Sequence, residues 1–192
     1  MVVIAETNFL VELALQQSEA QQAEAIVRLA EEQRIGLAIL AFAFVEAGVN
    51  LAKQLKRRDD LQNRLHAEVK QMARSPAFAT LTAGYEDLAQ RLQSFGKMHR
   101  RELAEVSRRL HAVATVIPVT EEVIDKMAQL KLEAGDACIC ASVECYVRHL
   151  NGDASVFVTR DRDFAAVASL LEANQCRMIY GFGAAFGVVR GL

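Results

Sequence analysis

The residues of this chain whose types and spacing suit chemistry are acidic. Four of them follow short apolar runs, and one lies at the predicted start of a helix: Glu6, Glu46, Asp136, Asp161 and Asp163. The carboxyl ends of parallel strands converge on one crevice, so acids placed at strand ends can meet there. Two such carboxylates repel by roughly 4 kcal/mol at ~4 Å and an effective dielectric of ~20. The pattern therefore predicts a divalent cation and, with it, phosphate chemistry.

The sequence pattern predicts that the elements that position these acids are alternating strands and helices. Strands are predicted over residues 2–5, 36–40, 116–119, 155–159 and 177–180. Helices are predicted over residues 8–17, 19–33, 121–131, 136–150 and 164–172, and a further helix carries Glu46. Alternation of this kind predicts right-handed crossovers and an α/β fold with helices on both faces of a parallel sheet. A length of 192 residues predicts a single domain over residues 1–192.

A different pattern occupies residues 51–113, which we interpret as an inserted helical hairpin. Two apolar series with steps of three and four make a narrow seam, as in a coiled coil, with a break at Ser75-Pro76. They are Leu51, Leu55, Leu61, Leu65, Val69 and Met72, then Tyr85, Leu88, Leu92, Phe95, His99, Leu103, Val106, Leu110 and Val113. Residues 53–113 contain 13 Lys+Arg and 7 Asp+Glu, whereas the rest of the chain contains 9 and 17. The insertion is thus basic and the body acidic.

Composition excludes several other classes of protein. A hydrophobic content of 52% argues against disorder, and the longest apolar run, residues 35–45, is too short to span a bilayer. The N-terminus shows no basic leader, so we expect no signal peptide, no membrane association and a cytoplasmic location. The four cysteines lack the spacing of a zinc site, and we expect them to be reduced, buried apolar residues.

Each acid also has an ordinary structural interpretation. Glu6 could be a solvated strand end, Glu46 a surface helix position and Asp136 a helix N-cap, while Asp161 and Asp163 could build a turn. The four local contexts together favour a shared site.

These contexts resemble the motifs of the PIN-domain nucleases, which include the VapC-type toxins. Glu6-Thr7-Asn8-Phe9-Leu10 resembles the opening motif, and Phe44-Val45-Glu46-Ala47 resembles the second acidic motif. The segment from Gly135 to Ala141 is similar to the third, and Val158 to Phe164 is similar to the last. The resemblance covers residues 1–50 and about 115–190. The chain departs from the family at Glu6, where an aspartate is usual, and in the basic hairpin, where the toxins have a shorter helical stretch.

The resemblance implies a PIN-like fold and a metal-dependent endoribonuclease. The toxin of a toxin–antitoxin pair is one role that the resemblance offers for such an enzyme. Glu6, Asp136 and Asp161 would hold Mg²⁺ or Mn²⁺, with Glu46 binding directly or through water and Asp163 in reserve. Thr7 and Thr159 would orient these carboxylates, and Asn8 is expected to cap the first helix. The implied partners are an RNA substrate, an antitoxin or another protein, and a second copy of the chain.

An acidic metal site repels RNA, so binding needs positive charge from elsewhere. The predicted nucleic-acid-binding residues are Arg57, Arg58, Arg100 and Arg101 in the hairpin, with Arg160 and Arg162 beside the last acids. The alternatives are an ordinary solvated helix face for the first four and ion pairs with the acidic site for the last two. The alternative function is a catalytically weak PIN domain that binds RNA or protein through its hairpin.

Overall fold

The computed structural model describes residues 1–75, 81–150 and 153–191. Its strands are β1 (Val2–Ala5), β2 (Gly36–Leu40), β3 (Thr115–Ile117), β4 (Ser155–Thr159) and β5 (Cys176–Tyr180). Its helices are α1 (Thr7–Leu15), α2 (Ala20–Glu31), α3 (Ala41–Met72), α4 (Leu81–Val113), α5 (Glu121–Met127), α6 (Ala134–His149), the 3₁₀ turn η2 (Asp163–Val167), α7 (Ala168–Ala173) and α8 (Phe182–Val189).

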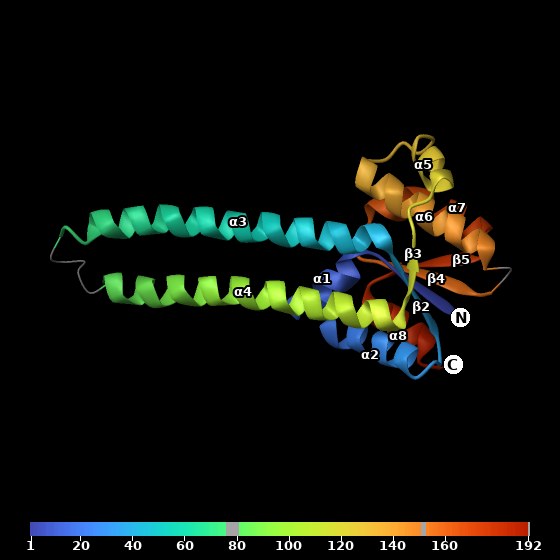
Figure 1. Ribbon diagram of the computed structural model, residues 1–192, viewed down its shortest axis with the longest axis horizontal. Helices are drawn as coiled ribbons and strands as arrows, with labels where there is room; N and C mark the ends of the chain where they lie inside the picture. The colour runs from blue at the N-terminus through green and yellow to red at the C-terminus, as the bar shows by residue number, and fades with distance from the viewer. Residues whose placement is uncertain (76–80, 151–152, 192) are drawn as a thin grey trace. The chain divides into compact units, whose positions relative to one another are not determined.

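The five strands form one parallel sheet in the order β3-β2-β1-β4-β5. Helices α1, α2 and α8 lie on one face of the sheet, and α6 and α7 lie on the other, with α5 packed on α6 (Figure 1). The predicted α/β class is therefore confirmed. The order runs outward from β1 in one direction and from β4 in the other, so the topological switch point lies between these two central strands.

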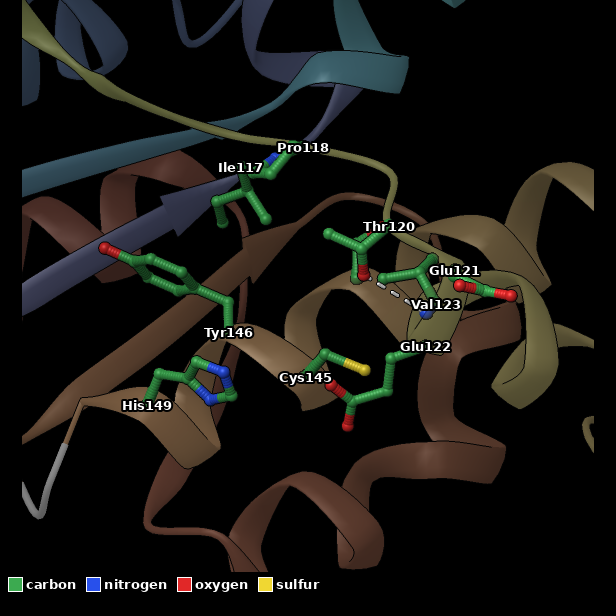
Figure 2. Close-up of a pocket in the computed structure, with 10 residues that line it drawn as sticks. Ile117, Pro118, Thr120, Glu121, Glu122, Val123, Cys145, Tyr146 and His149 are labelled. Atoms are coloured by element: carbon green, nitrogen blue, oxygen red, sulfur yellow. Dashed lines mark hydrogen bonds between the residues drawn. The ribbon is translucent and has the colours of Figure 1, made fainter.

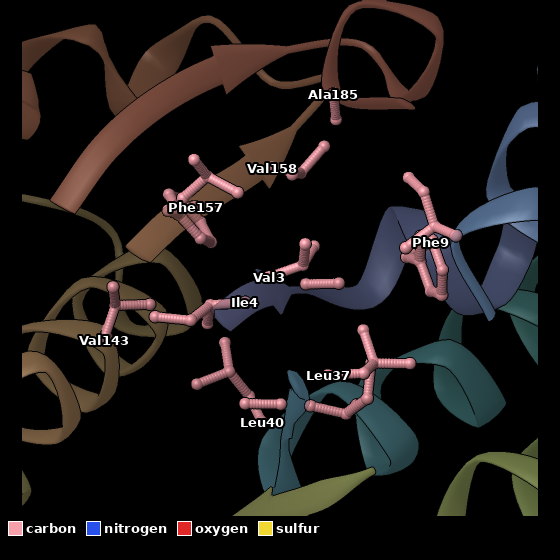
Figure 3. Close-up of a cluster of buried hydrophobic side chains, with 14 of the residues drawn as sticks. Val3, Ile4, Phe9, Leu37, Leu40, Val143, Phe157, Val158 and Ala185 are labelled. Carbon is pink, nitrogen blue, oxygen red and sulfur yellow. The ribbon is translucent and has the colours of Figure 1, made fainter. Parts of the chain in front are cut away.

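The central strands are buried and largely apolar because both of their faces are covered. Every residue of β4 is buried, as are the last three residues of β1. Figure 3 shows the core on both sides of the sheet, where Phe9 from α1 lies near the sheet residues Val3 and Leu37. Phe157 packs edge-to-face against Phe164, with ring centroids 5.6 Å apart. This core holds the ends of β1 and β4 in a defined register, Ala5 beside Val158.

The chain divides into two compact units, residues 1–47 with 103–192, and residues 48–102. We call the second unit the hairpin. It contains most of α3 and of α4, and its two helices are antiparallel, since Leu55 lies beside Gly96 while Gln62 is hydrogen-bonded to Tyr85. The predicted break at Pro76 lies outside the described residues. The helix that carries Glu46 continues into the hairpin without interruption as α3.

The predicted seam of the hairpin is only partly buried. Leu51 and Leu55 are 5% exposed, but Leu61, Leu88 and Phe95 are each about half exposed, at 54%, 49% and 49%. Steps of three and four show that apolar residues share one face of a helix. They do not show which of these residues contact the partner helix, so the sequence pattern overstated the burial of the seam. The four cysteines, all within the described residues, are buried and form no disulfide.

Candidate active site

Glu6 occupies the end of β1, at the switch point of the sheet. Its side chain is 2% exposed and caps helix α1, because its Oε2 atom accepts a hydrogen bond from the backbone N–H of Asn8 at 2.7 Å. Its Oε1 atom accepts a hydrogen bond from the Thr159 hydroxyl at 3.2 Å. The expectation that Asn8 caps α1 is wrong: Glu6 takes that position, and Asn8 supplies the backbone donor.

Thr159 connects the ends of β1 and β4. Its hydroxyl donates to Glu6 and accepts from the backbone N–H of Asp161 at 2.9 Å. The Asp161 carboxylate in turn accepts from the backbone N–H of Asp163 at 2.9 Å. One buried threonine thus positions both the first acid and the loop that carries the last two.

Glu46 lies between the starts of two helices. Its carboxylate accepts a hydrogen bond from the hydroxyl of Thr7 at the start of α1. At the start of α6, a methyl group placed on Gly135 would lie 3.5 Å from Oε1 of Glu46. This distance is an ordinary van der Waals contact, so the Glu46 carboxylate lies against the first turn of α6, at the glycine that precedes Asp136 in the sequence.

Asp136 lies in the first turn of α6, and it is not the N-cap, which is Glu133. Its pKa is raised above the usual aspartate value by partial burial first, and then by the negative charges of Asp161, Glu46 and Asp163. Burial also raises the pKa of Glu6 from 4.5 to about 7, against the lowering effect of its hydrogen bonds, and Glu46 adds to the increase. These effects on Asp136 and Glu6 indicate that the acids of α3 and α6 and those that follow β1 and β4 share one region.

Carboxylates alone make up this donor set, which is the chemistry that a hard divalent cation prefers. Among residues 1–75, 81–150 and 153–191, however, no three histidine, cysteine, aspartate or glutamate side chains converge closely enough to hold a metal ion. Both oxygens of the Glu6 carboxylate accept hydrogen bonds, from the backbone N–H of Asn8 and from the hydroxyl of Thr159. The residue types fit a magnesium or manganese ion.

Arg160 is held by a residue that sequence reasoning missed. Its guanidinium forms an ion pair with Glu12, which is completely buried in α1. Glu12 also accepts from the backbone N–H of Glu19, whose own carboxylate accepts from the backbone N–H of Phe182 at 2.9 Å. This chain of contacts ties the loop after β4 to both α1 and α8. The available signal was a lone acid within the apolar stretch Phe9–Leu15.

The predicted arginines are spread over the two units. Arg162 is exposed beside Asp163, and Arg57, Arg58, Arg100 and Arg101 all belong to the hairpin. Arg109, which follows the hairpin in α4, pairs with Glu24 and Glu31 of α2 and is thereby engaged within the body.

The body also has a cavity of about 300 Å³ away from the acids. Ile117, Pro118 and Val123 line one part of it, and Tyr146 and His149 of α6 line another (Figure 2). None of the predicted acids lines this cavity, so it belongs to the α5–α6 side of the fold rather than to the candidate site.

The central hydroxyl of the site leads to a prediction about stability. We expect Thr159→Val to lower the free energy of unfolding by about 1–3 kcal/mol, because the buried Glu6 carboxylate and the Asp161 N–H both lose a partner. Urea denaturation measures this change. Thr159→Ser, which keeps the hydroxyl and removes the methyl group, is the control and is expected to lose less; a loss as large as that of Thr159→Val would contradict a leading role for the hydrogen bonds.

No protein-family model matches the sequence, and no curated protein matches it either. Among solved structures, the chain is similar to a chain in the crystal structure of VapBC2 from Rickettsia felis, a complex bound to a DNA fragment from its own promoter. The TM-score is 0.51 with 11% sequence identity, over 94% of this chain and 99% of that chain. At this identity the likeness concerns the fold alone, and it supports the arrangement of a parallel sheet between helices.

Proposed function

We propose that this protein is a divalent-metal-dependent endoribonuclease of the PIN type. The observation that carries the proposal is the raised pKa of Asp136, to which the negative charges of Asp161, Glu46 and Asp163 contribute after burial; these acids come from three separate segments of the chain. Ligands of open α/β sheets bind outside the carboxyl ends of the strands at the switch point. Glu6 and Asp161 follow the two strands that flank this point.

The proposed metal ligands are Glu6, Asp136 and Asp161, with Asp163 beside them and Glu46 in direct or water-mediated contact. A bound Mg²⁺ or Mn²⁺ ion would lower the pKa of a water molecule and offset charge on the scissile phosphate. The chain's own residues prepare this arrangement. The Thr7 hydroxyl is hydrogen-bonded to the Glu46 carboxylate. The Thr159 hydroxyl is hydrogen-bonded to the Glu6 carboxylate and to the backbone N–H of Asp161. The ion pair of Arg160 with Glu12 anchors the loop after β4.

Glu6 is also able to exchange a proton near neutral pH. Burial raises its pKa to about 7, so that both protonation states are populated there. A cation that binds the carboxylate competes with that proton, so metal affinity should rise with pH through this range. We assign Glu6 to the metal site on these grounds.

The proposed partners follow from the resemblance and from the fold. The solved neighbour is a toxin–antitoxin complex, which supports a protein antitoxin as a partner of this chain. Exposed apolar side chains on the hairpin, among them Leu61, Leu88 and Phe95, offer a surface for that antitoxin or for a second copy. No described helix is both long enough and apolar enough to cross a membrane.

A second candidate function has its own support at Glu6. Both oxygens of this carboxylate are already hydrogen-bonded, to the Asn8 N–H and to the Thr159 hydroxyl. An acid satisfied in this way serves as a structural cap without a cation. The corresponding function is a catalytically weak PIN domain that binds RNA or protein through its hairpin.

Cleavage of a labelled RNA panel in Mg²⁺, Mn²⁺ or EDTA tests the proposal. We expect products with either metal and none in EDTA. An absence of cutting, together with thermal stabilisation by the metal, would favour the binding module instead. Cutting that persists in EDTA would contradict a metal-dependent mechanism.

A further inference from the structure

The hairpin contains a small cavity between its two helices. Its floor is apolar, formed by Leu55 of α3 with Leu92 and Gly96 of α4, and its volume is about 180 Å³. A methyl group added to Gly96 would come within 3.2 Å of Leu55 Cδ2, so the glycine allows the helices to approach closely there. The space corresponds to about six water molecules at ~30 Å³ each, which is room for a small polar group.

Three cationic side chains line this cavity: Arg58 from α3, and Lys97 and Arg100 from α4. A single carboxylate, that of Asp59, lines it with them. None of the three cations forms an ion pair with any residue that the structure describes. The cavity therefore has an excess of positive charge and hydrogen-bond donors that are available to an anion.

Arg58 is held in place by a histidine. Its Nη1 atom lies 3.2 Å from Nδ1 of His99, and a guanidinium can only donate. His99 must therefore accept through Nδ1 and is neutral in this arrangement. Burial and the charge of Arg58 both lower the pKa of His99, in agreement with that state. His99 thus orients Arg58 and leaves the cavity's cations unchanged at neutral pH.

We propose that this cavity binds a phosphate group of the RNA backbone. The argument rests on the proposed function, since an RNA substrate needs positive charge that the acidic crevice does not supply. The hairpin carries 11 Lys+Arg and 6 Asp+Glu, and the cavity is where three of those cations meet. Recognition would be through backbone charge and independent of base sequence.

The structure also separates the predicted hairpin arginines into two groups. Arg58 and Arg100 line the cavity, whereas Arg57 and Arg101 do not. Lys97 joins the first group, and Lys56 joins the second; all of these side chains are exposed except that of Arg58, which is half-buried. Each group contains three cations on the same two helices, so removing either set changes the net charge by the same amount.

The test compares two triple variants of the full chain. The cavity variant is Arg58→Gln, Lys97→Gln and Arg100→Gln, and the matched control is Lys56→Gln, Arg57→Gln and Arg101→Gln. Binding of a labelled single-stranded RNA is followed by fluorescence anisotropy in EDTA, so that cleavage plays no part. Circular dichroism checks that helix content is retained, since glutamine is a good helix former.

We expect the cavity variant to bind RNA about tenfold or more weakly, because charge-assisted hydrogen bonds are lost, and the control about two- to threefold. The slope of log Kd against log salt should fall by about 0.7 in the cavity variant, since one phosphate contact on a single strand contributes ~0.7. Equal losses in both variants, or no loss in either, would overturn the cavity as the binding site.

Titration with inorganic phosphate distinguishes the source of the phosphate group. We expect weak competition with RNA in the native protein and none in the cavity variant. If inorganic phosphate bound the native cavity while RNA affinity was the same in both triple variants, the RNA assignment would be overturned. Binding is measured without metal, so failure of the nuclease proposal can be recognised separately. The native protein would then bind RNA normally but would not cleave it in Mg²⁺ or Mn²⁺.

Discussion

Asp136→Asn is expected to reduce metal-dependent RNA cleavage by roughly a thousandfold or more, because a divalent ion contributes several kcal/mol of charge stabilisation in the transition state. Asp136 is the acid on which the charges of Asp161, Glu46 and Asp163 all act. Replacing it removes one ligand charge and retains the size of the side chain. Initial rates on a labelled RNA with Mg²⁺ or Mn²⁺ measure the effect.

The same change should not destabilise the protein in the absence of metal. The pKa of Asp136 is raised in the folded state, so its charged form is disfavoured at neutral pH, and asparagine removes that cost. Asp125→Asn, at an exposed position on α5, removes the same charge and should retain full activity. Cleavage that survives in the Asp136→Asn protein would place the activity in another site or another protein.

Glu6→Gln is expected to change how the stability of the metal-free protein depends on pH. Burial raises the folded-state pKa of Glu6 from 4.5 to about 7. Below pH 4.5 the group is protonated in both the folded and the unfolded chain, and it has no effect on their balance. Between pH 4.5 and 7 the unfolded chain releases the proton while the folded protein keeps it, so stability is lost as pH rises.

The shift corresponds to about 3 kcal/mol of unfolding free energy lost between pH 4.5 and 8 in the native protein. Glutamine cannot titrate, and its amide oxygen can still accept from the Asn8 N–H. The variant should therefore match the native protein near pH 4.5 and exceed its stability by about that amount at pH 8. Urea denaturation across this pH range measures the difference.

Two comparisons make the result specific to Glu6. Glu172→Gln, at an exposed position on α7, should show the pH dependence of the native protein. Mn²⁺ should stabilise the native protein more at pH 8 than at pH 6, and this gain should shrink in Glu6→Gln. A native-like pH dependence in the Glu6→Gln protein would mean that burial of this carboxyl group carries no such cost.

The alternation of strands and helices was readable from the sequence because it depends on local patterns. Ser155–Thr159 forms β4 with those bounds, since a strand covered on both faces needs an apolar centre such as Val156–Val158. The 3.6-residue period likewise indicated the helices of the hairpin. Boundaries set by side-chain contacts were less accurate: Glu6, rather than Asn8, caps α1 because the β1 end presents its carboxylate to the Asn8 N–H.

The sequence by itself determined which residues can do chemistry, since acid identity and position after an apolar run are local properties. Only the tertiary structure decided which of them lie together, because strand order is set by long-range pairing that places β1 beside β4. It also decided that Arg160 pairs with Glu12, 148 positions away, and that Arg58 and Arg100 share a cavity while Arg57 and Arg101 do not. Burial and charge pairing depend on neighbours distant in the chain, and the spacing of residues along one helix does not specify them.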